Sequence, residues 1–266
     1  MAVKSRKKSK RKTSNIIELR SGRLIAAIII VMIAAVVISS LVIANTQRRT
    51  PQTVYDFGKP VAQGIDVSEH NGKIDWDTVS ENFDFAFIRV GYRGYGNGEI
   101  CEDEFASQNL KAAQKAGIPT GVYFYSQAVS QEEARDEADF VLDIVKHYDI
   151  ELPVIMDFEY PTDEEGNRTG RLSDANLSKK ESTQIINAFC DRVEEKGYIS
   201  GLYASSGVMY HELNTDDLGD DTVIWTADYN DDVTYEIEYN IWQYSRTGET
   251  DGVSSKYVDL NYWYSN

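Results

Sequence analysis

From residue 61 onward, short apolar runs alternate with longer amphipathic segments. The short runs are rich in β-branched and aromatic residues, a composition typical of buried strands. Eight such runs occur, at residues 63–70, 85–93, 120–126, 153–160, 199–206, 222–229, 240–245 and 257–263. Eight strands alternating with helices is the strand number of a closed (β/α) barrel. We therefore expect an α/β fold built on a barrel of about eight strands.

Helical periodicity between the runs is strong only up to the fifth run. Amphipathic segments cover residues 102–117, 130–148 and 178–197. The second and third open with capping boxes, Ser130 with Glu133 and Ser178 with Glu181. Connections after the fifth run are short or polar and lack long helical periodicity. This pattern predicts an irregular barrel whose second half carries weak helices.

A continuous apolar segment precedes the barrel region. Residues 24–44 form an uncharged run of 21 residues, which as a helix is about 30 Å long, the thickness of a bilayer core. Basic residues crowd its N-terminal side, so we expect residues 1–23 to be a cytoplasmic tail and the remainder to be extracytoplasmic. A cleaved signal peptide is the alternative, although the run is long for one. Residues 45–60 are polar and predict a linker, leaving 61–266 as the catalytic barrel.

Charge and cysteine content narrow the function classes. The formal net charge is -16, but residues 1–23 carry nine basic residues and one acid, so the rest of the chain is strongly acidic. An acidic domain repels phosphate backbones, which argues against nucleic-acid binding. Cys101 and Cys190 are far apart and have no metal-type spacing, so we expect two unpaired thiols rather than a disulfide framework. We expect no cofactor and a monomer.

The stretch "VIMDFEY", residues 154–160, places two acids at the end of an apolar strand. Alternate residues of a strand share a face, so Asp157 and Glu159 point the same way and Phe158 points away. Mutual repulsion raises the pKa of one acid of such a pair. A protonated acid beside an ionised one is what glycoside hydrolysis requires. Taken alone, the pair fits a strand end that binds backbone amides or a cation better than it fits a catalytic pair.

Two further acids fall where a barrel would bring them to the same place. Asp66 ends the first run and Asp259 lies in the last run. In a closed barrel the first and last strands are neighbours, and the fourth faces them across the axis. The polar loop at residues 161–177 directly follows the Asp157/Glu159 pair, and barrels place their chemistry in loops after strands. Four acids are therefore expected around one cavity.

Aromatic residues near these strand ends suggest a sugar-binding groove. Tyr123, Tyr125 and Trp225 lie in predicted strands, and Gln243 stands between Trp242 and Tyr244. Aromatic rings stack on the apolar faces of sugars, and an amide side chain hydrogen-bonds hydroxyl or acetamido groups. Aromatic residues at a period of two also fill cores, so we expect about half of them to be buried there.

Seven motifs together resemble glycoside hydrolase family 25, the lysozymes of bacteria and phages. They are "GIDVSEHNGKIDW", "FAFIRVGYRG", "AGIPTGVYFYS", "VIMDFEY", "GLYAS", "IWQYS" and "VDLN", in the family's order and spacing over about residues 61–263. The resemblance implies a flattened, irregular (β/α) barrel. It also implies an N-acetylmuramidase that cleaves the β-1,4 bond from N-acetylmuramic acid to N-acetylglucosamine in peptidoglycan.

The resemblance further implies roles for individual residues. The acid/base glutamate of the family falls on Glu159, the partner aspartate on Asp157, and the two outer aspartates on Asp66 and Asp259. Either Asp157 attacks the sugar directly, or the substrate's acetamido oxygen attacks while Asp157 stabilises it; we favour the second. The expected substrate-binding residues are Tyr92, Tyr123, Tyr125, Trp225 and Gln243.

Two other functions remain open at this level. A non-catalytic wall-binding module would keep the groove without turnover, although the intact acid pair argues against it. A metal-dependent hydrolase would use the acids as ligands, but His70, His147 and His211 form no H-x-x-H or H-E-x-x-H pair. We expect no metal, His147 on the surface, and His70 as a candidate groove residue.

Overall fold

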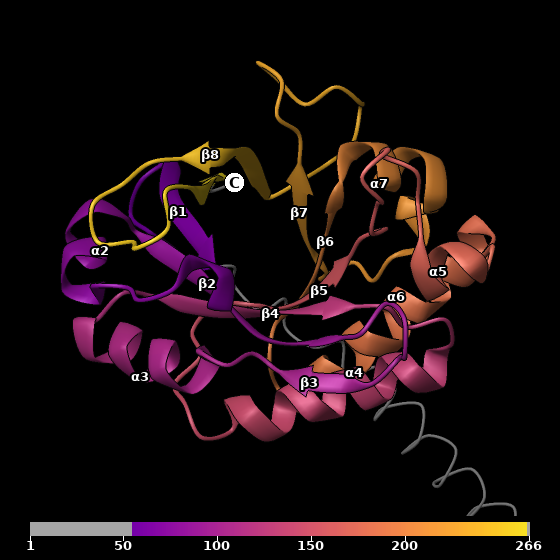
Figure 1. The fold of residues 1–266 in the computed structure, drawn as a ribbon, viewed down its shortest axis with the longest axis horizontal. Helices are drawn as coiled ribbons and strands as arrows, with labels where there is room; N and C mark the ends of the chain where they lie inside the picture. The colour runs from indigo at the N-terminus through magenta and orange to yellow at the C-terminus, as the bar shows by residue number, and fades with distance from the viewer. Residues whose placement is uncertain (1–54, 265–266) are drawn as a thin grey trace, which may run out of the picture. The chain divides into compact units, whose positions relative to one another are not determined.

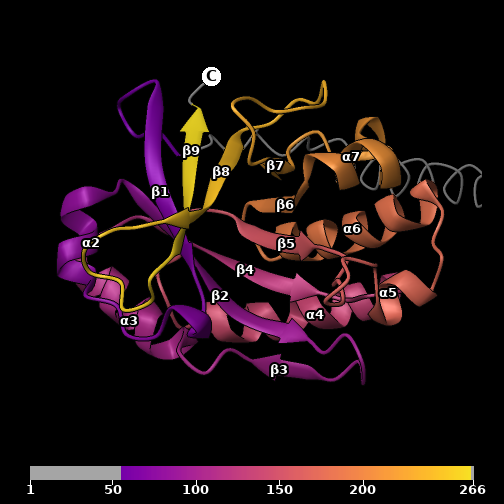
Figure 2. The same ribbon diagram turned by 45° about the horizontal axis from the view of Figure 1, so that its top comes forward.

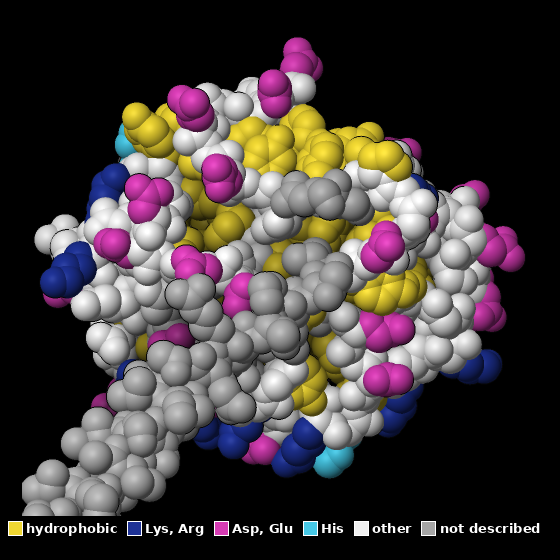
Figure 3. Space-filling view, turned by 180° about the vertical axis from the view of Figure 1, so that it is seen from behind, with side chains coloured by type: hydrophobic (Ala, Val, Ile, Leu, Met, Phe, Trp, Pro, Cys, Tyr) yellow, Lys and Arg dark blue, Asp and Glu magenta, His cyan; other side chains and the backbone are white. Residues whose placement is uncertain are grey.

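The computed structural model describes residues 55–264, which belong to one compact unit, Gln52–Asn266. The predicted basic tail, the apolar segment at 24–44 and most of the predicted linker lie outside the described residues. Among residues 55–264, no helix has both the length and the apolar character needed to cross a bilayer. Acidic side chains are scattered over the face seen in Figure 3, as the excess of acids in the sequence leads one to expect.

Eight strands of one sheet close into a barrel (Figures 1 and 2). They follow the order β1, β2, β4, β5, β6, β7, β8, β9, and β9 returns to pair with β1. The bounds are β1 Val61–Val67, β2 Phe85–Arg93, β4 Thr120–Ser126, β5 Val154–Phe158, β6 Ser200–Ser205, β7 Val223–Ala227, β8 Ile241–Gly248 and β9 Val258–Tyr264. Each lies within or overlaps one of the eight predicted runs, so the expected barrel is confirmed.

The direction of β9 distinguishes this barrel from an all-parallel one. Neighbouring barrel strands from β1 through β8 run parallel, whereas β9 is antiparallel to both β8 and β1. The beginning of β9 therefore lies beside the end of β1, and Asp259 stands opposite Asp66 in the register. Counted around the barrel in either direction, β5 lies four strands from β9. The acids of β5 thus face those of β1 and β9 across the barrel.

Helices cover one side of the barrel. Their bounds are α2 Trp76–Asn82, α3 Ala106–Ala116, α4 Gln131–Val145, α5 Gly170–Asp174, α6 Lys179–Glu194 and α7 Ser206–Glu212, with 3-10 turns η1 Glu69–Asn71 and η2 Thr215–Asp217. Within the described chain no helix follows β7 or β8 (Figure 2). The predicted weakness of helices in the second half is confirmed. Polar loops join these strands instead.

The two predicted capping boxes have different outcomes. At α6, Ser178 and Glu181 cap each other reciprocally, as predicted. At α4, the Ser130 hydroxyl accepts from the Glu133 backbone N–H, but the Glu133 carboxylate accepts from the backbone N–H of Val129 instead of Ser130. The Glu133 carboxylate also binds Arg171, which lies far from it in the sequence. A tertiary ion pair has therefore drawn the side chain away from the local cap.

Aromatic residues fill the barrel interior. Phe85, Phe87, Trp225 and Trp263 are fully or almost fully buried, and the rings of Phe87 and Trp225 have centroids 4.6 Å apart. Glycine makes room for them: a Cβ on Gly64 would lie 2.3 Å from the Phe85 ring, which is its register partner on β2. Small residues opposite large ones let the interior pack as a solid core rather than a pore. This packed interior supports the strand ends.

Two features of the fold were not predicted. A three-residue strand, β3 Ile100–Glu102, pairs antiparallel with the end of β2 and extends the sheet outside the barrel. It is too short to give a periodic signal. In addition, the ring of Phe57 packs on Phe85 and Trp263, with centroids 5.5 and 5.3 Å apart. Contacts with the barrel therefore begin inside the segment predicted as linker.

Candidate active site

The four predicted acids gather at one end of the barrel. Ile155 belongs to the interior cluster and Phe158 to the cluster under the helices, so the alternation of β5 turns Asp157 inward. Glu159 follows one residue after β5 ends. The negative charge of Asp66 raises the pKa of each of the other three acids. The predicted convergence of Asp66, Asp157, Glu159 and Asp259 is therefore present in the structure.

Asp66 is held by two amide side chains. Its Oδ2 accepts from Gln243 Nε2 at 2.9 Å and from Asn261 Nδ2 at 2.8 Å, and the side chain is buried. Asn261 is itself oriented by Trp225, whose Nε1 donates to Asn261 Oδ1 at 2.9 Å. Burial raises the pKa of Asp66 to about 6, and the two amide bonds keep it from rising further.

Asp259 forms a hydrogen-bonded carboxyl pair with Asp66. Burial, followed by the negative charge of Asp66, raises the pKa of Asp259 to about 8. The Asp66–Asp259 bond lowers the pKa of Asp66 and raises that of Asp259. Near neutral pH the proton of the pair therefore stays on Asp259, whose O–H donates a hydrogen bond to Asp66.

Asp157 is buried between two tyrosines in the register of the sheet, Tyr125 on β4 and Tyr203 on β6. Its Oδ1 is buried and has no hydrogen-bond partner among the described residues. Burial and then the charges of Glu159 and Asp66 raise its pKa well above the ordinary aspartate value, against the attraction of Arg89. A buried carboxyl oxygen without a donor is costly unless a ligand supplies one.

Glu159 is half-buried and faces the same group of acids. Burial raises its pKa most, the negative charge of Asp66 adds to the increase, and a hydrogen bond with Tyr203 opposes it. A raised pKa is the property that lets a glutamic acid carry a proton near neutrality and donate it. Of the four acids, Glu159 is the one that leaves the sheet and enters the loop region.

Gln243 joins Asp66 to two tyrosines. Its Oε1 accepts from the hydroxyls of Tyr203 at 2.8 Å and Tyr229 at 2.7 Å. Because the Asp66 carboxylate can only accept, the amide nitrogen must face it, and Oε1 is left to accept from the two hydroxyls. Burial raises the pKa of both tyrosines, so they remain protonated donors. Gln243 thus positions Asp66 from a buried site.

A cavity of about 650 Å³ lies beside the acids. Its lining includes Arg89, Tyr92, Tyr125 and His70. Arg89 is held by Asp103, whose Oδ2 lies 2.8 Å from Nε, and by Glu69, and its guanidinium lies 5.4 Å from the Tyr92 ring centre. Arg89 also lowers the pKa of Asp157. None of the four acids lines the cavity itself, which adjoins them through Arg89 and through Tyr125, the register partner of Asp157.

The residues predicted to bind substrate divide into two groups. Tyr92 and Tyr125 line the cavity, where their rings are available to a ligand. Tyr123 is packed edge-on against Trp225, with ring centroids 6.2 Å apart. Trp225 is 1% exposed and Gln243 is 2% exposed, so neither offers a free face to a sugar. These two residues support Asp66 and Asn261 from inside the barrel.

Sequence reasoning did not single out several residues of the site. Tyr203, Tyr229 and Asn261 hydrogen-bond to the acids directly or through Gln243, and Arg89 acts on Asp157 through its charge. Arg89 is a charged residue in the middle of the largely apolar run "FAFIRVGYR", which ends at a second arginine, Arg93, and that signal was available. Tyr203 and Asn261 are ordinary polar residues of strands, and Tyr229 lies in the loop after β7. Only the pairing of distant strands brings these three residues to the acids.

The remaining sequence predictions concern cysteine, histidine and metal. Cys101 and Cys190 are both free thiols, as predicted. His147 is exposed just after α4, and His70 lines the cavity, again as predicted. Over residues 55–264 no three histidine, cysteine or acidic side chains are arranged to hold a metal ion.

A closed barrel whose strand ends gather carboxylic acids of raised pKa beside an aromatic-lined cavity is the arrangement of a glycoside hydrolase. The model of the glycosyl hydrolases family 25 matches residues 65–253. The chain belongs to this family.

Known proteins of several bacteria are similar to this chain. It is 28% identical over 211 residues to YegX of Escherichia coli K12, covering 74% of this chain and 68% of YegX. It is 25% identical over 209 residues to Lysozyme M1 of Streptomyces globisporus, covering 75% and 66%. The modular autolysin LytC of Streptococcus pneumoniae, solved with a synthetic peptidoglycan ligand, has 26% identity and a TM-score of 0.65. That match covers 77% of this chain but only about half of LytC, 47%.

The carboxyl pair predicts a pH-dependent stability. Because the folded pKa of Asp259, about 8, exceeds its ordinary value of 3.8, the folded protein binds more protons than the unfolded chain between these values. Its free energy of unfolding therefore falls as the pH rises through this window. An amide at this position would carry no charge and could still donate to Asp66. We expect Asp259→Asn to stabilise the protein by on the order of 1–3 kcal/mol at pH 8, and by little at pH 4.

Urea unfolding of both proteins, followed by tryptophan fluorescence at pH 4 and pH 8, measures this difference. Asp220→Asn removes one acid from an exposed loop and serves as the control for a simple loss of charge. An Asp259→Asn variant that gains no more stability at pH 8 than Asp220→Asn would contradict the protonated state of the half-buried Asp259.

Proposed function

We propose that this protein is a peptidoglycan hydrolase of the N-acetylmuramidase type. It cleaves the β-1,4 bond between N-acetylmuramic acid and N-acetylglucosamine. The observation that carries the proposal is the group of four carboxyl groups at one barrel end, all with raised pKa, in a chain of family 25. The similarity to Lysozyme M1 and to the autolysin LytC supports the choice of peptidoglycan as substrate.

Glu159 is the proposed general acid and base. Its raised pKa supports a protonated state in the resting enzyme. In the first step the proton passes from Glu159 to the glycosidic oxygen as the bond from the anomeric carbon to that oxygen breaks. In the second step the Glu159 carboxylate takes a proton from water, and the water oxygen bonds to the anomeric carbon as the bond made there in the first step, to the acetamido oxygen or to Asp157, breaks. The enzyme returns to its starting protonation state, and one water is consumed.

Asp157 is the proposed partner of the substrate's acetamido group. In this substrate-assisted route the acetamido oxygen attacks the anomeric carbon, and positive charge develops on the acetamido nitrogen and carbon. The buried, unpartnered Oδ1 of Asp157 supports this role, because an acetamido N–H would supply the missing donor. Direct attack by Asp157, through a covalent glycosyl-enzyme, is the alternative route.

The cavity supports a place for the saccharide next to the acids. Tyr92 and Tyr125 offer ring faces for stacking on sugar rings, and His70 lies on the same wall. Peptidoglycan and the surface of this protein are both anionic, so net charge does not attract the substrate. Binding therefore depends on contacts within the cavity.

The role of Glu159 is tested with Glu159→Gln, which preserves size but cannot transfer the proton. We expect kcat to fall by about 10²–10⁴-fold, the usual contribution of a general acid. Release of fragments from purified peptidoglycan, with mass analysis for a reducing-end muramic acid, measures the activity and identifies the bond. Near-normal turnover of the variant would remove Glu159 from the role, and an inactive wild type would favour a non-catalytic wall-binding module.

The role of Asp157 is tested with Asp157→Asn. Folding should be retained, because removal of a buried charge relieves repulsion among the acids. We expect kcat to fall about 10²-fold or more, since the amide cannot stabilise the developing positive charge. Circular dichroism checks the fold and the peptidoglycan assay checks kcat. A loss of less than about threefold would refute the charge-stabilising role.

We also propose that residues 24–44 anchor the enzyme in the cell membrane, with the N-terminus cytoplasmic and the barrel extracytoplasmic. The uncharged run of 21 residues and its basic N-terminal flank support this. Alkaline carbonate extraction of bacterial membranes should leave the full chain in the pellet and release a variant lacking residues 24–44. Release of a shortened product that lacks residues 1–44 would favour cleavage of the segment as a signal peptide.

A further inference from the structure

The backbone of Glu159 lies just beyond the hydrogen-bonded sheet. The last register pair between β4 and β5 joins Ser126 to Phe158, and β5 pairs with β6 only as far as Asp157. Glu159 therefore has no strand partner in the ladder. A residue outside the ladder is free to rotate about its backbone angles unless other contacts hold it.

The side chain of Gln127 replaces the missing ladder contact. Gln127 directly follows β4, is 0% exposed, and donates from Nε2 to the backbone carbonyls of Ser126 and Glu159, both at 2.8 Å. Because carbonyl oxygens only accept and two of them face this end of the amide, the orientation of the amide is fixed. Its Oε1 is buried without a partner among the described residues. The amide is thus used only as a donor.

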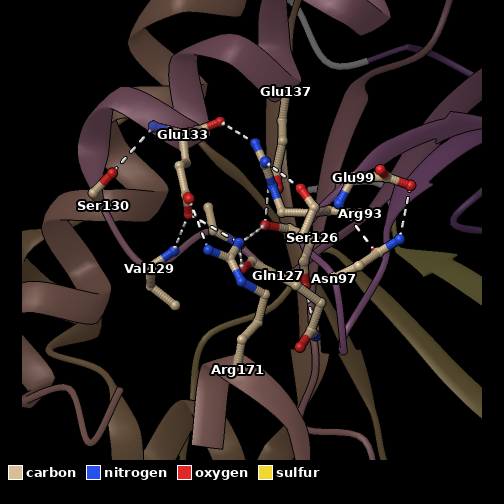
Figure 4. Close-up of polar contacts among 12 residues, drawn as sticks. Arg93, Asn97, Glu99, Ser126, Gln127, Val129, Ser130, Glu133, Glu137 and Arg171 are labelled. Carbon is tan, nitrogen blue, oxygen red and sulfur yellow. Dashed lines mark hydrogen bonds and ion pairs between the residues drawn. The ribbon is translucent and has the colours of Figure 1, made fainter. Parts of the chain in front are cut away.

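Arg171 completes a closed ring of contacts around this point (Figure 4). Its NH1 donates to the backbone carbonyl of Gln127 at 2.9 Å, and both terminal nitrogens bind the Glu133 carboxylate, at 2.7 and 3.0 Å. Arg171 lies on α5, in the segment that follows Glu159. The ring therefore consists of three parts: the backbone from Glu159 to Arg171, the hydrogen bond from Arg171 to Gln127, and the hydrogen bond from Gln127 to the Glu159 carbonyl.

The same ring is attached to the wall of the cavity. The backbone N–H of Arg171 donates to the carbonyl of Tyr95 at 2.9 Å, and Tyr95 lines the cavity. Glu133 is held in place at the start of α4 by the backbone N–H of Val129. The pKa of Glu133 is lowered by Arg171 and Val129, which outweigh its burial, so this carboxylate is ionised and its bond to Arg171 is charge-assisted.

We infer that Gln127 is a positioning residue for the general acid: with Arg171 and Glu133 it fixes the backbone of Glu159 and so the direction of its carboxyl group. This inference rests on the proposed function of Glu159. In this role Gln127 does not contact the substrate. A catalytic proton transfer requires the donor within hydrogen-bond reach of the leaving oxygen, and a displacement of about 1 Å costs as much as 10²-fold in rate.

The test replaces Gln127 with methionine, which has a similar length and loses only the amide. We expect kcat to fall about tenfold or more while KM changes less than about twofold, because binding contacts in the cavity remain. The pH at which kcat declines on the alkaline side should also move, since the surroundings of the Glu159 carboxyl change. Peptidoglycan turnover by the full-length protein, measured across pH, gives all three quantities.

Thr120→Val is the matched control. Thr120 begins the same strand at its other end, is buried, and donates through Oγ1 to the carbonyl of Ile118 at 2.8 Å. The substitution is isosteric and removes one buried side-chain hydrogen bond, so it should lower stability without changing kcat or its pH profile. If Gln127→Met behaves like Thr120→Val, with kcat and pH profile unchanged, Gln127 is only structural and the inference is overturned.

Two further measurements keep the inference separate from the proposed function. Titration of the Glu159 carboxyl by ¹³C NMR in wild type and Gln127→Met needs no turnover, and an unchanged titration curve would overturn the inference even if no substrate were cleaved. Should Gln127→Met fail to fold, Arg171→Met opens the ring at a partly exposed side chain. It should lower kcat in the same direction, and unchanged kcat in that variant would again overturn the inference.

Discussion

The antiparallel entry of β9 between β8 and β1 is the constraint on which the site depends. If β9 ran parallel to its neighbours, its beginning would lie at the opposite end of the barrel from the end of β1. Instead, Asp259 stands opposite Asp66, and Asn261 reaches the Asp66 carboxylate at 2.8 Å. One reversal of chain direction therefore brings a second acid and its supporting amide to the end where the parallel strands finish.

Gathering these acids has an energetic cost that the surrounding residues limit. Burial is the largest cause of the raised pKa of each of the four acids, and the charge of Asp66 adds to it for the other three. The protein offsets part of this cost with neutral donors, such as Gln243 and Asn261 on Asp66, and with the charge of Arg89 near Asp157. Neutral donors stabilise the ionised form without neutralising the group, so the cluster keeps both ionised and protonated members.

The barrel and the four acids could be predicted from the sequence, but the residues that hold these acids in place could not. Strand runs and paired carboxylates are local patterns, so the period of two and the D-x-E spacing could be read along the chain. Gln127, Tyr203 and Asn261 carry no local pattern, because their roles arise from pairing between strands distant in sequence. For Trp225 the sequence was misleading. An aromatic residue near the strand ends suggested a platform for stacking on sugars, but its ring is buried in the barrel interior. Burial of an aromatic residue depends on tertiary packing.

The pairing of β9 with β1 also links completion of the site to completion of the fold. The bond between Asn261 and Asp66 joins residues 195 positions apart, so it closes a long loop, and this closure costs chain entropy. A molecule in which β9 has not yet paired has an open sheet and only half of the carboxyl pair. The same contact that closes the barrel therefore completes the acid pair.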